Sequence, residues 1–434
     1  MYLKKIDLFF ESLMKNKKML YGFFIFVSII FSLLAISRRV DSVTYPQFWA
    51  EDGATWYANA YSMGPLKPFF IPVSGYFQTI SRITASLSLF LPLHSVPLFF
   101  NLIALVIQVL PAIFFLSKRF EKVIESFGAR FLISLAYLGF PSTFETHLNL
   151  SNSQWRLAIL IFLIMIAKPS SSKAWKIFDG LLLAVAGLSG PFSIMLMPVF
   201  CIYYYLSKNK SQQLLNFFIV LTTGFVQFVS VLFEIGSHAR GQINLGISAL
   251  GFSKIFAGKV VISSLLGARV YNSIWRSSWW NDGYATILVT IIAIALLGYV
   301  LKKAELELKL FIIYSYLVFS MALIFPMVSS ADMTEWDAML RPFGGNRYFL
   351  LPMLGFIVSI VWIFARAGKA KCLKYFTTFL LGMFIFIGIP FGWIIAPYKD
   401  FNFSNQAKQF EAFPLGKSMD FKINPGWTMT LIKK

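Results

Sequence analysis

Residues 19–37 read MLYGFFIFVSIIFSLLAIS, an apolar run without a charged side chain that ends at Arg38 and Arg39. A helix needs about 20 mostly apolar residues to cross the roughly 30 Å of hydrocarbon in a bilayer. The run meets this length, and two arginines follow it instead of the small residues that mark a signal-peptide cleavage site. We therefore expect an uncleaved first transmembrane helix.

The rest of the chain has the composition of a membrane protein. Hydrophobic residues make up 57% of the 434 residues and charged residues 13%, whereas a soluble domain carries about 25% charged residues. Further runs of spanning or nearly spanning length lie at 94–117, 129–143, 155–167, 177–189, 191–206, 214–234, 284–301, 310–328, 349–367 and 375–395. The sequence therefore predicts an all-α polytopic membrane protein with about 11 transmembrane helices.

The positive charges set the expected orientation. The chain has 39 Lys and Arg against 19 Asp and Glu, a net charge of +20 that would suit a nucleic-acid-binding protein if the charges were clustered. More than half of the basic residues instead lie in short segments at 1–18, 118–130, 168–177, 207–213, 302–309 and 366–374. Because Lys and Arg favour cytoplasmic loops, these segments are expected inside, with the N-terminus cytoplasmic and the C-terminus outside.

The long connecting segments are all expected outside. We expect one transmembrane unit, 1–395, followed by a short outside tail, 396–434. The unit contains a first outside loop at 38–76 and a second long outside segment at 235–283. Since the cytoplasmic loops are short, any chemistry is expected to face outward.

An apolar stretch at 259–270 is expected not to cross the membrane. A crossing there would place Lys302 and Lys303 outside, against the distribution of positive charge. We therefore expect an interfacial or re-entrant helix. The chain's two cysteines and three histidines are not grouped, so neither a disulfide framework nor a metal site is predicted.

Two adjacent carboxylates, Glu51 and Asp52, stand near the start of the first outside loop, with aromatic residues before and after them. Carboxylates close to lipid are costly to hold there, which favours a function. One of them could act as a general base on an acceptor hydroxyl while the other orients the substrate. The alternative is an acidic pair in the first turn of a solvated helix.

Arg82 follows this loop among apolar residues, with the hydrogen-bonding side chains of Tyr76 and Gln78 a few positions before it. It could hold a phosphate or a sugar. The alternative is a side chain that anchors the protein in the lipid headgroups.

A polar loop at 145–156 separates two short apolar runs. A loop this polar at membrane depth must line a water-filled cavity or be buried in protein. Its candidates for contacts to sugar hydroxyls or a diphosphate are His147, Asn152, Gln154 and Arg156. The alternative is a solvent-exposed turn with an interfacial tryptophan.

A last cluster of polar residues surrounds a Gly-Gly turn directly before the apolar run at 349–367. Its members are Arg341, Asn346, Arg347 and Tyr348. Two arginines around such a turn could grip a phosphate through paired hydrogen bonds. The alternatives are ordinary interfacial placement and pairing with the preceding acids Asp332, Glu335 and Asp337.

Together these motifs resemble a bacterial group of polytopic glycosyltransferases in the GT-C superfamily, which use polyprenyl-phosphate-linked sugars. The stretches that carry the resemblance are 48–53, Gly75-Tyr76 with Arg82, 152–158, 346–348 and the tail segment 423–429. The length and expected topology are also similar to those of phage-type O-antigen glucosyltransferases that convert serotype.

The resemblance implies an inverting glycosyltransferase that moves a sugar, with glucose favoured, from a polyprenyl-phosphate carrier to a surface polysaccharide such as O-antigen. It implies the bacterial inner membrane, chemistry on its outer face, and a separate donor synthase and flippase as partners. It requires no cofactor and leaves a divalent metal open.

The resemblance also assigns expected roles to the site residues. The catalytic acid maps to Glu51 or Asp52, a choice that stays open, and the donor phosphate is expected on Arg82, Arg341 and Arg347. Substrate contacts are expected from Tyr76, Gln78, His147, Asn152, Gln154, Arg156, Asn346 and Tyr348.

Two other functions remain as alternatives. A polysaccharide polymerase or ligase would share the outward arginines without depending on the first-loop acids. A lipid-linked glycan transporter would need ionisable residues inside the spans, where the sequence has few of them.

Overall fold

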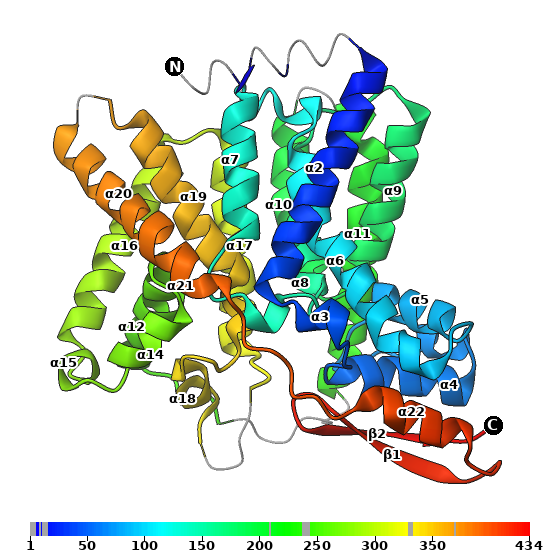
Figure 1. Ribbon diagram of the computed structural model, residues 1–434. Coiled ribbons are helices and arrows are strands. Elements are labelled where there is room, and N and C mark those ends of the chain that lie inside the picture. The colour runs from blue at the N-terminus through cyan, green and yellow to red at the C-terminus, as the bar shows by residue number, and fades with distance from the viewer. Residues whose placement is uncertain are drawn as a thin grey trace.

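A computed structural model describes residues 6–7, 10, 16–207, 210–236, 244–328, 333–368 and 370–434. The described part is a bundle of helices with one small β-hairpin near the C-terminus (Figure 1). The expected acid Asp332 and part of the second long outside segment, 237–243, lie outside the described residues.

Within the described part, seven helical stretches are long and apolar enough to cross a membrane. They are α2 (Lys17–Arg38), η3 with α6 (Leu93–Phe115), α11 (Lys210–Gly236), α16 (Tyr284–Lys303), α17 (Leu306–Ile324), η7 with α19 (Asn346–Arg366) and α20 with η8 and α21 (Lys371–Trp393). The prediction of a mostly helical chain with many apolar helices is therefore confirmed.

The exposed surface of these helices is apolar, as a lipid-facing surface must be. On α2, for example, Tyr21 is 67% exposed, and Ile25 and Phe26 are each 62% exposed. A water-soluble bundle would turn such side chains inward and place charged residues on the outer face. The chain is therefore compatible with a multi-pass membrane protein.

Four shorter helices lie among the long ones: α7 (Phe127–Leu138), α8 (Gln154–Ile166), α9 (Lys173–Gly187) and α10 (Phe192–Leu206). Almost every residue of α8 is buried, and the helix packs against α6, α9, α10 and α19. Because α8 runs through the centre of the bundle, the polar loop before it ends inside the protein (Figure 1).

A helical segment between α11 and α16 turns back on itself. It consists of α12 (Ala249–Ile255), η6 (Phe256–Ile262), α13 (Ser263–Leu265) and, after a turn, α14 (Ala268–Ile274), with α15 (Ser278–Asn281) following. The turn lies at Gly267, whose φ of +88° suits glycine. A Cβ added at Gly258 would lie 2.5 Å from the ring of Tyr271, so α14 packs closely along η6.

Short elements gather at the lower end of the bundle in Figure 1. The first loop forms α3 (Asp41–Thr44), η1 (Asp52–Tyr57), α4 (Ala58–Met63) and η2 (Lys67–Phe70), and is followed by α5 (Thr79–Ser88). The segments before α8 and α19 add η5 (Phe144–Thr146) and α18 (Glu335–Leu340). One further short element, η4 (Lys118–Phe120), follows the opposite end of α6.

The tail after α21 folds onto the first loop at this end. It contains α22 (Phe403–Glu411) and two antiparallel strands, β1 (Ser418–Ile423) and β2 (Trp427–Ile432). These strands were not predicted from the sequence. They form because apolar and polar residues alternate along them. Phe421, Met429 and Leu431 are buried while their neighbours are exposed, as in a hairpin with one buried face.

Candidate functional site

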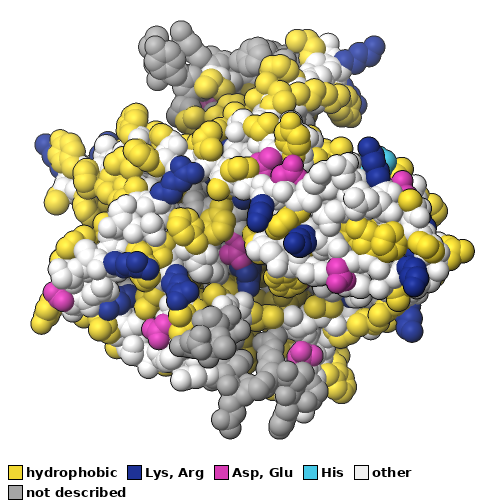
Figure 2. All heavy atoms as spheres, turned by 60° about the horizontal axis from the view of Figure 1, so that its bottom comes forward, with side chains coloured by type: hydrophobic (Ala, Val, Ile, Leu, Met, Phe, Trp, Pro, Cys, Tyr) yellow, Lys and Arg dark blue, Asp and Glu magenta, His cyan; other side chains and the backbone are white. Residues whose placement is uncertain are grey.

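A cavity of about 1120 Å³ lies between the lower ends of the helices, the first loop and the C-terminal hairpin. Figure 2 looks onto this end of the molecule and shows a hollow near its centre, with acidic side chains beside it. A cavity of this size exceeds the usual 300–1,000 Å³ of small-molecule sites. It is therefore large enough for a bulky or two-part ligand.

The cavity has one apolar wall. Three helices build it, with side chains from α10 (Ile194, Met195), α11 (Val231, Ile235) and α17 (Val318, Met321, Ala322), and Phe325 directly after α17 adds to it. Most of the remaining lining is polar or aromatic, and it comes mainly from the first loop, the loop before α8, the segment around the Gly-Gly turn and the C-terminal hairpin. An amphipathic ligand would match this division.

The two adjacent acids of the first loop are separated by the fold. The Glu51 side chain lines the cavity, and its carboxylate makes no hydrogen bond or ion pair with a side chain or backbone group of the described residues. Asp52 is 1% exposed and lies behind the wall, where it accepts hydrogen bonds from the Ser151 amide at 2.8 Å, the Ser151 hydroxyl at 2.7 Å and the Leu150 amide at 3.2 Å. Glu51 is thus the carboxylate that a ligand would meet.

Burial perturbs Asp52 strongly. It raises the pKa of the Asp52 carboxyl to about 7, and the hydrogen bonds from Ser151 and Leu150 offset only part of this effect. The negative charge of Glu51 adds to the rise. The same hydrogen bonds join the first loop to the loop before α8. The Asp52 side chain does not line the cavity.

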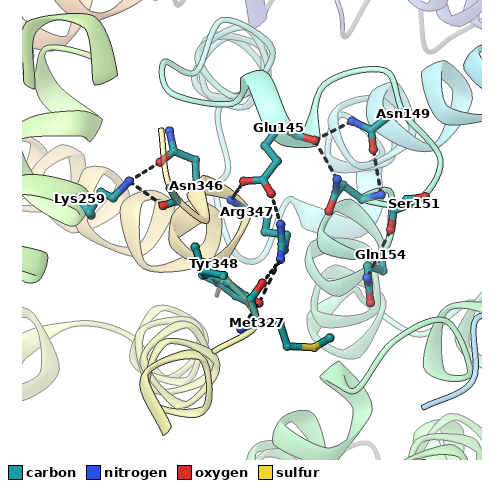
Figure 3. Close-up of polar contacts among 12 residues, drawn as sticks. Glu145, Asn149, Ser151, Gln154, Lys259, Met327, Asn346, Arg347 and Tyr348 are labelled. Carbon is teal, nitrogen blue, oxygen red and sulfur yellow. Dashed lines mark hydrogen bonds and ion pairs between the residues drawn. The ribbon is translucent and has the colours of Figure 1, made fainter. Parts of the chain in front are cut away.

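An ion pair on the cavity wall joins distant parts of the chain (Figure 3). The Arg347 guanidinium pairs with the Glu145 carboxylate, which also accepts a hydrogen bond from the Arg347 amide at 3.0 Å. The same guanidinium donates to the Met327 carbonyl at 2.7 Å and to the Tyr348 hydroxyl at 3.2 Å. These contacts fix its position at the cavity.

A buried ammonium supports the segment that carries Arg347 (Figure 3). Lys259, on η6, donates to the carbonyls of Pro342 at 3.1 Å and Gly344 at 2.8 Å and to Asn346 Oδ1 at 2.5 Å. Sequence reasoning assigned no role to Lys259 or to Glu145. A lone lysine inside an apolar stretch was the available signal, since such a charge needs partners when it is buried.

The structure brings about half of the candidate residues to the cavity. Those that line it are Glu51, Tyr76, Gln78, Asn152, Gln154, Arg347 and Tyr348. Those that lie elsewhere are Asp52, Arg82, His147, Arg156, Arg341 and Asn346. For both groups of residues, the proposed roles in binding or catalysis stay predictions.

Arg82 lies behind an aromatic side chain of the lining. Its guanidinium carbon is 4.7 Å from the ring centroid of Trp56, and Nη2 donates to the Ile71 carbonyl at 3.3 Å. Trp56 lines the cavity and donates from Nε1 to the Ser151 hydroxyl at 3.1 Å. In this arrangement Arg82 would influence a ligand through Trp56.

Two other candidates of the polar loop are enclosed by protein. His147 is fully buried between Gln108, 2.9 Å from its Nδ1, and the Ala35 carbonyl, 3.0 Å from its Nε2. Arg156 is 1% exposed and lies over the ring of Tyr137 at 5.0 Å. By contrast, Arg341 is exposed.

Acidic groups outnumber basic ones on the cavity wall. The lining includes the carboxylates of Glu51, Glu145, Glu234 and Glu335, and Arg347 as its one Lys or Arg among the described residues. Within the same described part, no group of three or more His, Cys, Asp or Glu side chains is arranged to hold a metal ion. The wall therefore favours a ligand rich in hydroxyl groups, and Arg347 is the cationic side chain that the described wall offers it.

Comparison of the chain with models of known protein families, with curated proteins and with solved structures finds no match.

Proposed function

We propose that the protein is an inverting GT-C-type glycosyltransferase that moves a sugar, with glucose favoured, from a polyprenyl-phosphate carrier to a cell-surface polysaccharide such as O-antigen. The resemblance of its loop motifs supports this proposal, as does the chemistry of the cavity. The observation that carries it is Glu51, whose carboxylate has no hydrogen-bond or ion-pair partner among the described residues and lies on the wall of a large cavity with one apolar side.

Glu51 is the proposed general base. The acceptor hydroxyl gives its proton to the Glu51 carboxylate while its oxygen forms a bond to the anomeric carbon of the donor sugar. The bond from that carbon to the carrier phosphate breaks on the opposite side, and the phosphate leaves with the electron pair. The anomeric configuration is inverted and no nucleotide takes part.

The two-sided lining suits an amphipathic donor. The apolar wall from α10, α11 and α17 would cover the first isoprene units of the lipid, and the sugar would lie among the polar side chains. Arg347, held in place by Glu145, is the proposed contact for the leaving phosphate. Arg82 and Arg341 do not line the cavity, so the proposal assigns neither of them a direct contact with the phosphate.

The topology that fits this function has eleven membrane crossings, made by the seven long helices together with α7, α8, α9 and α10. The α12–α14 hairpin would be a re-entrant element. In this arrangement the basic loops at the upper end of Figure 1 face the cytoplasm, and the cavity and tail face outward. The protein would then lie in the bacterial inner membrane and depend on a donor synthase and a flippase inside the cell.

Glycan analysis tests the proposal. The gene is expressed with and without a polyprenyl-phosphate glucose synthase, and the surface polysaccharide is examined by mass spectrometry and NMR. We expect a new side-branch hexose only when both genes are present, and none with Glu51→Gln at equal membrane levels. A polysaccharide without the hexose in the wild-type strain would overturn the proposed activity, and full activity of Glu51→Gln would overturn the proposed base.

A further inference from the structure

The C-terminal hairpin reaches the cavity with one aromatic side chain. Trp427, the first residue of β2, lines the cavity together with Pro425 from the turn. In the described structure Trp427 pairs with Ile423 across the hairpin.

The alternation of the strand shows that Trp427 belongs to its inward face. Side chains two apart on a strand share a face, and Met429 and Leu431 on this face are 0% and 2% exposed. Ile423, opposite Trp427, is also buried and packs against Gly53 of the first loop. Trp427 is nevertheless 44% exposed. The Trp427 side chain points inward, but it faces the cavity and not the protein atoms that cover Met429 and Leu431.

The hairpin turn is fixed to the residue before Glu51. The Asn424 carbonyl accepts a hydrogen bond from the Ala50 amide at 2.5 Å, and the Asn424 amide donates to the Phe48 carbonyl at 3.2 Å. The Asn424 side chain is held in turn by the Lys399 amide and carbonyl, both at 2.9 Å. The position of Trp427 is thus set relative to Glu51 by backbone contacts.

A second tryptophan lines the same cavity. Trp49 also lines the cavity, and its ring stacks on Tyr398 with centroids 5.0 Å apart and planes inclined by 22°. Aromatic faces bind the apolar C–H faces of sugar rings, whereas carboxylates and amides bind the hydroxyl edges. Trp49, Trp427 and Pro425 can contact the C–H face of a sugar ring. Glu51 and Gln78 can bind its hydroxyl groups.

We infer that Trp427 forms an acceptor subsite, a platform on which a hexopyranose ring of the acceptor polysaccharide stacks while its hydroxyl is presented to Glu51. This inference rests on the proposed function. Trp427 is then a binding residue for the acceptor, with no part in holding the donor. A tryptophan that only anchored the protein in lipid headgroups would project from the outer surface and not into the cavity.

The test uses the purified full-length protein and three variants. Trp427→Ala removes the platform, Trp427→Phe keeps a smaller one, and Thr428→Ala alters the exposed opposite face of the same strand as a matched control. The probes are undecaprenyl-phosphate glucose and an oligosaccharide released from the surface polysaccharide of the expressing strain. Transfer kinetics are measured for both substrates, and calorimetry measures oligosaccharide binding without donor.

For Trp427→Ala we expect the KM for the oligosaccharide to rise about tenfold, which equals about 1.4 kcal/mol. The donor KM and kcat should stay within about twofold, which is less than 0.5 kcal/mol. Trp427→Phe should recover part of the loss, and Thr428→Ala should match the wild type in transfer, binding and thermal stability.

Equal oligosaccharide binding by Trp427→Ala and the wild type would overturn the subsite even if transfer occurs. Wild-type binding that depends on Trp427 without any transfer would support the subsite and overturn the proposed reaction. No binding by the wild type would overturn the subsite.

Discussion

Glu145 and Arg347 lie 202 positions apart in the sequence and form an ion pair on the wall of the cavity. Glu145 belongs to the loop before α8 and Arg347 to the segment before α19. Through this pair, and through Lys259 behind it, three segments of the chain define one side of the proposed active site. The pair is a clear target for mutation because both partners are largely enclosed.

The coupling between Glu145 and Arg347 can be measured by a double-mutant cycle. Each single change, Glu145→Gln or Arg347→Gln, leaves a charge without its partner and should lower the free energy of unfolding by about 1–3 kcal/mol. The double variant should lose less than the sum of the two changes. Apparent Tm in detergent gives the measurement. Additive losses would show that the pair contributes nothing to stability.

The two acids of the first loop should respond differently to neutralisation. Glu51→Gln should lower kcat by about 10²- to 10⁴-fold, because it removes the proposed base, and it should leave the thermal stability unchanged. Asp52→Asn should lower stability, because an amide cannot accept all the hydrogen bonds that Ser151 and Leu150 donate. Glu411→Gln, at the exposed end of α22, is the matched control. A fully active Glu51→Gln would remove Glu51 from the mechanism.

Asp52 should make stability depend on pH. Its pKa is about 7 in the folded protein against an ordinary value of 3.8 for an aspartate, so between these values the folded state holds a proton that the unfolded state has lost. This contribution is complete below the unfolded pKa and is lost as the pH rises through about 7, with a slope approaching 1.4 kcal/mol per pH unit. We expect apparent Tm to fall more steeply from pH 4 to 7 in the wild type than in Asp52→Asn. Parallel curves would contradict the raised pKa.

The close packing of α14 on η6 depends on a glycine. Gly258→Ala would place a methyl group 2.5 Å from the ring of Tyr271, which must separate the two helices and should cost about 1–3 kcal/mol. Gly298→Ala, on α16, is the matched control because nothing lies within 4 Å of its added Cβ. Levels of folded protein in detergent should fall only for the first variant. Equal levels would mean that the hairpin adjusts without loss.

The proposed orientation can be tested by thiol labelling. The described structure has two free cysteines, Cys201 on α10 and Cys372 at the start of α20, both exposed. In a Cys201→Ala background, a membrane-impermeant maleimide should label Thr428→Cys in intact spheroplasts and should reach Cys372 only after lysis. Labelling of Cys372 in intact spheroplasts would reverse the proposed topology.

Much of the fold could be predicted because it depends on local properties of the chain. Whether a run such as 19–37 can enter a membrane is set by the sum of its own transfer free energies. The expectation for the apolar stretch 259–270 was different in kind, because it depended on the positive charges of Lys302 and Lys303 further along the chain. The hairpin of the tail was not predicted, although its alternation at 418–423 is a local signal, because long apolar runs that favour helices dominate the sequence.

The sequence by itself determined a helical chain with many apolar segments, an uneven distribution of positive charge, and the presence of two acids beside one another. Only the tertiary structure decided that Glu51 faces the cavity while Asp52 is buried, that Arg347 reaches it while Arg82 stays behind Trp56, and that Trp427 remains uncovered. The reason is physical. Helix formation and membrane affinity depend on adjacent residues, whereas the burial and pairing of a side chain depend on whichever distant segment packs against it.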